Sequence, residues 1–210
     1  MMVGLCGAHR TGKTTLARLY AKEAGIEFVE TSVSVINKEL GFDLTKEHSF
    51  AERLNQQYII LDRVDEIYAR YSGERCIVDR TPLDMISYTM AEAINDRVSD
   101  EGQARFAQYV QKCFDITNKR FGVVVLVQPG IEIKDAEGKA APNRAYIEHL
   151  NTLILGLVCD ERLNVPHGYI QRNKTDLADR LEAVDYCIGS VYREAHATML
   201  RLKQKGACVH

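Results

Sequence analysis

The stretch GAHRTGKTTLA, Gly7–Ala17, decides the fold, and it directly follows the short apolar run Val3–Cys6. Gly7, four further residues and then Gly12-Lys13-Thr14 match the phosphate-binding pattern G-x-x-x-x-G-K-[ST]. In this pattern backbone N–H groups line a concave loop that takes phosphate oxygens, and glycine permits the backbone angles that the loop needs. The context agrees, because such a loop follows a strand and opens a helix whose positive end faces the anion.

Two side chains of this stretch have specific expected roles. Lys13 is expected to reach the β- and γ-phosphates of a nucleoside triphosphate, and the Thr14 hydroxyl is expected to bind Mg²⁺. We expect the whole loop to hold the triphosphate, and its residues are Gly7, Ala8, His9, Arg10, Thr11, Gly12, Lys13, Thr14 and Thr15.

The composition of the whole chain narrows the class of protein. Its 210 residues are 46% hydrophobic and 27% charged, so we expect one globular domain over residues 1–210. The net charge of −2 gives no overall basic field toward nucleic acid. The six cysteines show no C-x-x-C spacing, so a zinc site is not expected. No signal peptide or long apolar span is visible, and the expected location is cytoplasmic, with no membrane partner.

Apolar runs alternate with helical patterns along the chain, which predicts an α/β fold of the P-loop NTPase type. We expect about five parallel strands with helices on both faces, and the strand candidates are Val3–Cys6, Ile26–Glu30, Cys76–Val78, Val123–Val127 and the weaker Tyr169–Ile170. The longest helix signal is Ser49–Tyr71, which opens with the capping box Ser49-x-x-Glu52. A last helix is expected from about Leu177 to about Lys203, with breaks.

A polar, turn-rich segment lies between the fourth and fifth expected strands. It runs over Ile131–Asn143, a length that in a compact domain is usually functional or disordered. Beside a phosphate loop it is predicted to be a mobile lid over about residues 131–146, and a plain surface loop is the alternative.

The second informative stretch is IVDRTPLDMISY, Ile77–Tyr88. Asp79 and Arg80 follow an expected strand, at the sheet edge where open α/β sheets bind ligands. A carboxylate there can hold Mg²⁺ or take a proton from an attacking hydroxyl, and an arginine can fork onto a phosphate. The alternative is a salt bridge or helix cap. Asp84 is either a second site carboxylate or an exposed first-turn residue.

Together, Gly7–Thr15 and Asp79–Asp84 resemble the small P-loop kinases of nucleosides and nucleotides. The likeness is to the AAA-type ATPase/kinase group of phages and bacteria, which includes nicotinamide riboside kinase-like domains, and it covers about the first 150 residues. It implies ATP and Mg²⁺ as cofactors, Thr14 and Asp79 at the metal, and Asp79 and Arg80 at the acceptor. It further implies a basic lid over the phosphates, for which the candidates are Lys134, Lys139 and Arg144.

The resemblance leaves several residues undecided. Arg10 stands where many such kinases have a small residue, and it either contacts a phosphate or points into solvent. Gln56 or Gln57 would read the edge of a base if this chain follows deoxynucleoside kinase-like enzymes, and the alternative is a pair of exposed polar residues. Arg172 and Asn173 follow the fifth expected strand, where related kinases seat adenine.

Three functions remain open at this point. The favoured one is a kinase with Lys13, Asp79, Arg80 and Arg144 as catalytic residues, acting on a nucleoside, nucleotide or related small acceptor. The second is a phage-type kinase of a hydroxymethylated pyrimidine base in DNA. The third is an NTP-hydrolysing switch or ATPase, for which Asn173-Lys174-Thr175-Asp176 spells the guanine signature N-K-x-D, although the D-x-x-G element is missing. Both a monomer and a homodimer are compatible with the sequence.

Overall fold

A parallel sheet forms the centre of the computed structural model, which describes residues 1–42, 48–93, 98–133 and 143–204. The sheet has five strands in the order β2-β3-β1-β4-β5, and every neighbouring pair is parallel. The strands are β1 (Met2–Cys6), β2 (Glu27–Val29), β3 (Cys76–Val78), β4 (Val123–Val127) and β5 (His167–Ile170). The predicted α/β fold with five parallel strands is confirmed.

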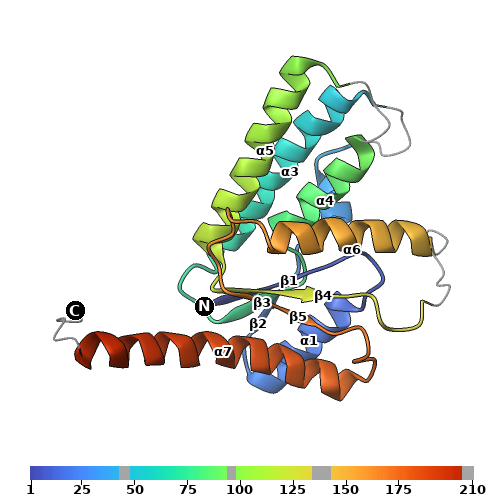
Figure 1. Cartoon of the computed structure of the whole chain (residues 1–210). Coiled ribbons are helices and arrows are strands. Elements are labelled where there is room, and N and C mark those ends of the chain that lie inside the picture. The colour runs from blue at the N-terminus through green and yellow to red at the C-terminus, as the bar shows by residue number, and fades with distance from the viewer. Residues whose placement is uncertain (43–47, 94–97, 134–142, 205–210) are drawn as a thin grey trace.

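Helices cover both faces of this sheet (Figure 1). They are α1 (Lys13–Ala24), α2 (Val33–Glu39), α3 (Phe50–Arg70), α4 (Pro82–Ala93), α5 (Asp100–Arg120), α6 (Arg144–Val158) and α7 (Leu177–Gln204). Helices α1 and α7 pack on one face, and α3, α4, α5 and α6 lie on the other. No helix within the described ranges is both long and apolar enough to cross a bilayer.

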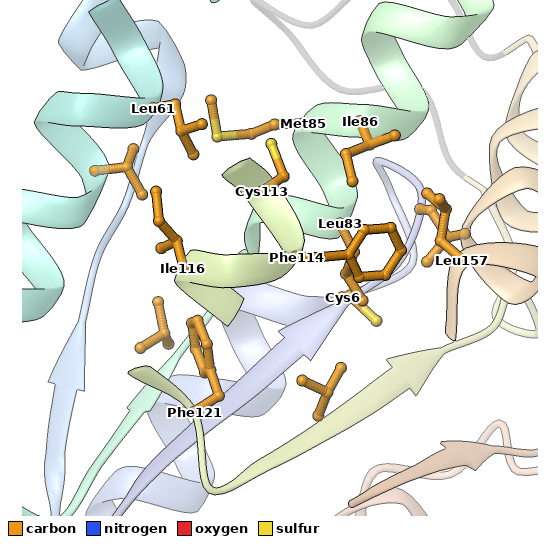
Figure 2. Packing of buried hydrophobic residues seen from close by; sticks show 14 of the residues in the cluster. Cys6, Leu61, Leu83, Met85, Ile86, Cys113, Phe114, Ile116, Phe121 and Leu157 are labelled. Atoms are coloured by element: carbon orange, nitrogen blue, oxygen red, sulfur yellow. The ribbon is translucent and has the colours of Figure 1, made fainter. Parts of the chain in front are cut away.

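The larger core fills the space between the sheet and helices α3 to α6. Figure 2 shows side chains of α3, α4 and α5 meeting those of the sheet, and the labelled examples include Leu61, Leu83, Ile86, Phe114 and Cys6. In the same core the rings of Tyr68 and Phe121 meet edge to face, with centroids 5.0 Å apart. This packing buries side chains of both β1 and β3, and the loops that follow these two strands form the candidate site.

The parallel arrangement places the carboxyl ends of all strands at one edge. The register pairs Gly4 with Val78 on one side and with Val124 on the other. The loop after β1 therefore lies between the loops after β3 and β4, which is where ligands bind in open α/β sheets.

The local sequence pattern predicted α3 correctly. Its capping box between Ser49 and Glu52 is present with both hydrogen bonds. Helix α7 differs from the expectation, because it is continuous from Leu177 to Gln204 and the predicted breaks are wrong. Gly189 lies inside it, where a glycine in place of alanine costs only about 1 kcal/mol. Helices α2, α5 and α6 were not predicted.

Most of the predicted lid lies outside the described residues. Segment 134–142, which includes the candidates Lys134 and Lys139, lies outside the described residues. Arg144 is described and is the first residue of α6.

Two glycines of the fold provide a matched pair of substitutions for stability. A Cβ at Gly4 would lie 2.6 Å from the Thr81 methyl and 2.7 Å from the Phe121 ring, whereas a Cβ at Gly156 meets nothing within 4 Å. We expect Gly4→Ala to lower the free energy of unfolding by about 1–3 kcal/mol through overpacking. Gly156→Ala, in exposed helix, should raise it by about 0.5–1 kcal/mol. Urea denaturation measures both, and equal effects of the two changes would contradict this account of the core.

Candidate active site

The phosphate loop leaves β1 at Cys6 and enters α1 at Lys13. Its backbone has positive φ at Gly7 (145°), Arg10 (61°) and Gly12 (80°). A Cβ at Gly7 would also lie 2.5 Å from the carbonyl oxygen of Val127, so the loop is pressed against the end of β4. Glycine is therefore required at Gly7 both by its backbone angle and by this close approach.

Lys13 spans this loop from the inside. Its side chain is buried, and Nζ donates hydrogen bonds to the carbonyl oxygens of Gly7 (2.5 Å) and Ala8 (2.7 Å). Burial lowers the pKa of Lys13 to about 8, since the nearby carboxylate of Asp84 offsets only part of the desolvation. The loop thus encloses a lysine whose charged form is disfavoured by burial, at the position where the sequence pattern expects phosphate.

The two predicted metal ligands are in direct contact. The Thr14 hydroxyl donates to Oδ2 of Asp79 at 2.8 Å, and the Thr31 N–H approaches the other carboxylate oxygen at 3.4 Å. Asp79 is only 6% exposed although it follows the end of β3. A carboxylate beside a hydroxyl supplies the hard oxygen donors that Mg²⁺ prefers, so the residues present fit this ion.

Asp84 joins the two loops of the site. Its Oδ1 accepts from the Gly7 N–H at 3.0 Å, and its Oδ2 accepts from the Thr81 N–H (2.8 Å) and hydroxyl (3.1 Å). The residue is 1% exposed, which excludes one of the two alternatives that the sequence left open, an exposed first-turn residue. Burial raises the pKa of Asp84, and the neighbouring charges of Lys13 and Arg80 oppose that shift. Asp84 is therefore a buried anchor between the phosphate loop and the loop after β3.

A cluster of rings connects the phosphate loop to helices α4 and α6. The Tyr88 hydroxyl accepts from the His9 N–H at 3.1 Å and lies 3.0 Å from His9 Nδ1. Burial and the charge of Lys13 lower the pKa of His9, which favours the neutral imidazole. The ring centroids of Tyr146 and His9 are 5.8 Å apart. The Arg80 guanidinium carbon lies 5.8 Å from the centroid of the Tyr88 ring. Sequence reasoning missed both tyrosines, although Tyr88 ends the second quoted motif.

The other predicted residues lie at varying distances from this centre. Arg144 is exposed at the first turn of α6, two residues before Tyr146. Arg172 forks onto Glu148 at 2.6 and 2.7 Å, which ties the loop after β5 to α6. The amide oxygen of Gln57 faces the Tyr109 hydroxyl at 3.5 Å.

The N-K-x-D spelling is explained by helix capping. Its last residue, Asp176, lies directly before α7 and accepts from the Ala178 N–H at 2.8 Å. A carboxylate in that position satisfies an otherwise unpaired donor at a helix start. This contact accounts for the aspartate without a guanine base.

Arg180 of α7 was also missed by sequence reasoning. It is 4% exposed, and its guanidinium donates to the Thr11 carbonyl of the phosphate loop at 2.6 Å. The two residues are 169 positions apart, so no local pattern could have connected them.

The loop, its buried lysine and the Thr14–Asp79 pair define the chain as a P-loop NTPase-type protein. A family model described as AAA domain (AAA_28) matches residues 2–151, and the chain belongs to this family. The family expected from the sequence is thus confirmed. A comparison with curated proteins found no match.

Solved structures show the same fold at low sequence identity. Deoxyadenosine kinase from M. mycoides with bound dCTP is similar at a TM-score of 0.62 and 17% identity, over 90% of this chain and 100% of that one. Thymidylate kinase from Ehrlichia chaffeensis is similar at 0.55 and 10%, over 91% and 98%. YorR protein from Bacillus subtilis, in complex with phosphorylated GDP, is similar at 0.53 and 12%, over 92% and 98%. The protein therefore has the fold of P-loop nucleoside and nucleotide kinases.

Asp84→Asn tests the anchor between the loops. The substitution removes a buried charge and places an NH₂ group among N–H donors, so we expect the free energy of unfolding to fall by about 3 kcal/mol. The matched control is Asp62→Asn, which removes an exposed carboxylate paired with Lys112 and should cost less than about 1 kcal/mol. Denaturant unfolding compares the two, and equal losses would show that Asp84 is not an anchor.

Proposed function

We propose that the protein is an ATP- and Mg²⁺-dependent kinase that transfers the γ-phosphoryl group to a nucleoside, nucleotide or related small acceptor. The observation that carries this proposal is the contact between Thr14 of the phosphate loop and Asp79 after β3, at 2.8 Å. It brings a phosphate-binding loop and an acidic group to one point of the sheet edge. The deoxyadenosine and thymidylate kinases share this chain's fold, which supports the choice of acceptor class.

The donor side is formed by the phosphate loop. Backbone N–H groups of residues 7–15, with Arg10 among them, would hold the triphosphate, and Lys13 would exchange its two carbonyl partners for phosphate oxygens. The Thr14 hydroxyl and Asp79 would hold Mg²⁺, which would neutralise negative charge on the triphosphate.

The acceptor side is formed around the loop after β3. Asp79 would orient the acceptor hydroxyl and take its proton, and Arg80 would neutralise charge on the group in transfer. Arg80 is held over the Tyr88 ring, beside His9 and Tyr146, so a cation and aromatic faces lie together. That combination suits an acceptor that carries both a flat base and a phosphoryl group. Arg144, the first residue of α6, would also neutralise charge on the group in transfer.

Proton uptake tests the role of Lys13 in donor binding. At pH 8 the Lys13 side chain of the protein without nucleotide is about half protonated, because its pKa is about 8. A bound triphosphate favours the charged form, so binding of MgATP should take up about 0.5 proton at this pH. Calorimetric titration in two buffers of different ionisation enthalpy measures the uptake. It should vanish in Lys13→Arg, whose side chain stays charged, and proton release by the wild-type protein would contradict this role.

The decisive assay offers radiolabelled ATP and Mg²⁺ with nucleosides, mononucleotides, and unmodified or hydroxymethylated oligonucleotides. We expect label on a small acceptor. Asp79→Asn should lower transfer by at least about 10²-fold while MgATP binding survives. Asp62→Asn, on an exposed pair with Lys112, is the control and should keep wild-type activity.

Other outcomes of this assay would replace the proposal. Label that appears only in hydroxymethylated DNA would identify a DNA-base kinase. ATP hydrolysis that no acceptor diverts would identify a switch or ATPase.

A further inference from the structure

Helix α7 contacts the phosphate loop through one buried cation. Arg180 lies in the first turn of α7, on the sheet face that α7 shares with α1. Its Nη2 donates to the Thr11 carbonyl oxygen at 2.6 Å. A Cβ placed on Gly12 would lie 3.0 Å from Nη1, so the guanidinium lies directly against the Thr11–Gly12 peptide. Any side chain at Gly12 would push it away.

The charge of this guanidinium has no carboxylate partner within the described ranges. The ion pairs found there do not include Arg180, and its protein partner is a backbone carbonyl. Burial lowers the pKa of the Arg180 guanidinium. A buried cation without a countercharge is unfavourable in the empty protein, and it becomes favourable when an anion enters beside it.

The geometry of a peptide bond determines what this contact does. In a planar trans peptide the C=O and the following N–H point in opposite directions. Arg180 holds the Thr11 oxygen, so the Gly12 N–H of the same peptide is directed away from the guanidinium. A hydrogen bond from a charged donor also polarises the peptide and makes its N–H a stronger donor.

We propose that Arg180 is a positioning residue for the donor nucleotide, which orients the Gly12 N–H toward the polyphosphate and adds positive charge behind the loop. This inference rests on the proposed function only in requiring that the loop binds a nucleoside triphosphate or diphosphate. It assigns to α7, outside the two sequence motifs, a direct part in donor affinity.

A structural role and a positioning role predict different results for Arg180→Met. A merely structural arginine would lower the melting temperature of the empty protein and leave nucleotide affinity unchanged. A positioning arginine should leave that melting temperature within about 4 °C of wild type, because removing a buried unpaired charge offsets the lost hydrogen bond. The affinity for MgADP should then fall at least about tenfold, which corresponds to about 1.4 kcal/mol.

The experiment measures the dissociation constant of MgADP by calorimetry, and thermal unfolding with and without MgADP, for the chain of 210 residues. MgADP is the probe because it binds without turnover and needs no acceptor. The matched control is Arg193→Met, which removes an exposed arginine of the same helix that lies over Tyr186, 5.1 Å from its ring centroid. It should bind MgADP as the wild type does.

Each outcome supports or overturns the inference. Wild-type affinity in folded Arg180→Met would overturn it and leave the proposed function standing. Failure of the wild-type protein to bind MgADP or MgATP would overturn both. If Arg180→Met does not fold, Arg180→Lys is measured instead. Lysine keeps the charge but not the planar fork. A loss of at least about threefold in its affinity supports the inference, and an unchanged affinity overturns it.

Discussion

The Asp84 carboxylate joins the loop after β3 to Gly7 of the phosphate loop, 77 positions away, and the rest of the site depends on this link. One oxygen holds the first N–H of the phosphate loop, and the other holds the N–H and hydroxyl of Thr81. Because β1 and β3 are neighbours, this link lies at the same edge of the sheet as the contact between Thr14 and Asp79. The charges of Lys13 and Arg80 offset part of the cost of burying the carboxylate, so a cation expected to act on phosphate also stabilises the loop that carries it.

Predictions that depended on local spacing agreed with the structure. The phosphate loop, the sheet strands and the capping box of α3 each rest on residues a few positions apart. The approach of Asp79 to Thr14 could also be anticipated, since parallel strands end at the same edge. Asp84 was ambiguous for a physical reason. An acid in the first turn of a helix is favourable in solvent as well, and only tertiary packing decides its burial.

The missed features depend on contacts that no short window contains. Arg180 occupies an amphipathic helix, and its partner Thr11 is at the other end of the chain. Tyr146 belongs to the site because its ring lies near the His9 ring, which is far from it in the sequence. Helix α5 is a different case, because Ser99 caps it through the Gly102 N–H and its buried residues recur at helical spacing. That helix was within reach of sequence reasoning.

The length of α7 has a consequence for how its far end stays folded. Its first half packs on the sheet through Val184 and its neighbours, whereas the helix then continues past the edge of the sheet (Figure 1). Residues 192–194 and 196–198 of this continuation are exposed. An isolated helix shorter than about 12–15 residues is marginal in water because nucleation is unfavourable. Here the packed half is the nucleus, so each further turn requires only propagation. Backbone amide protection should accordingly decline gradually toward Gln204.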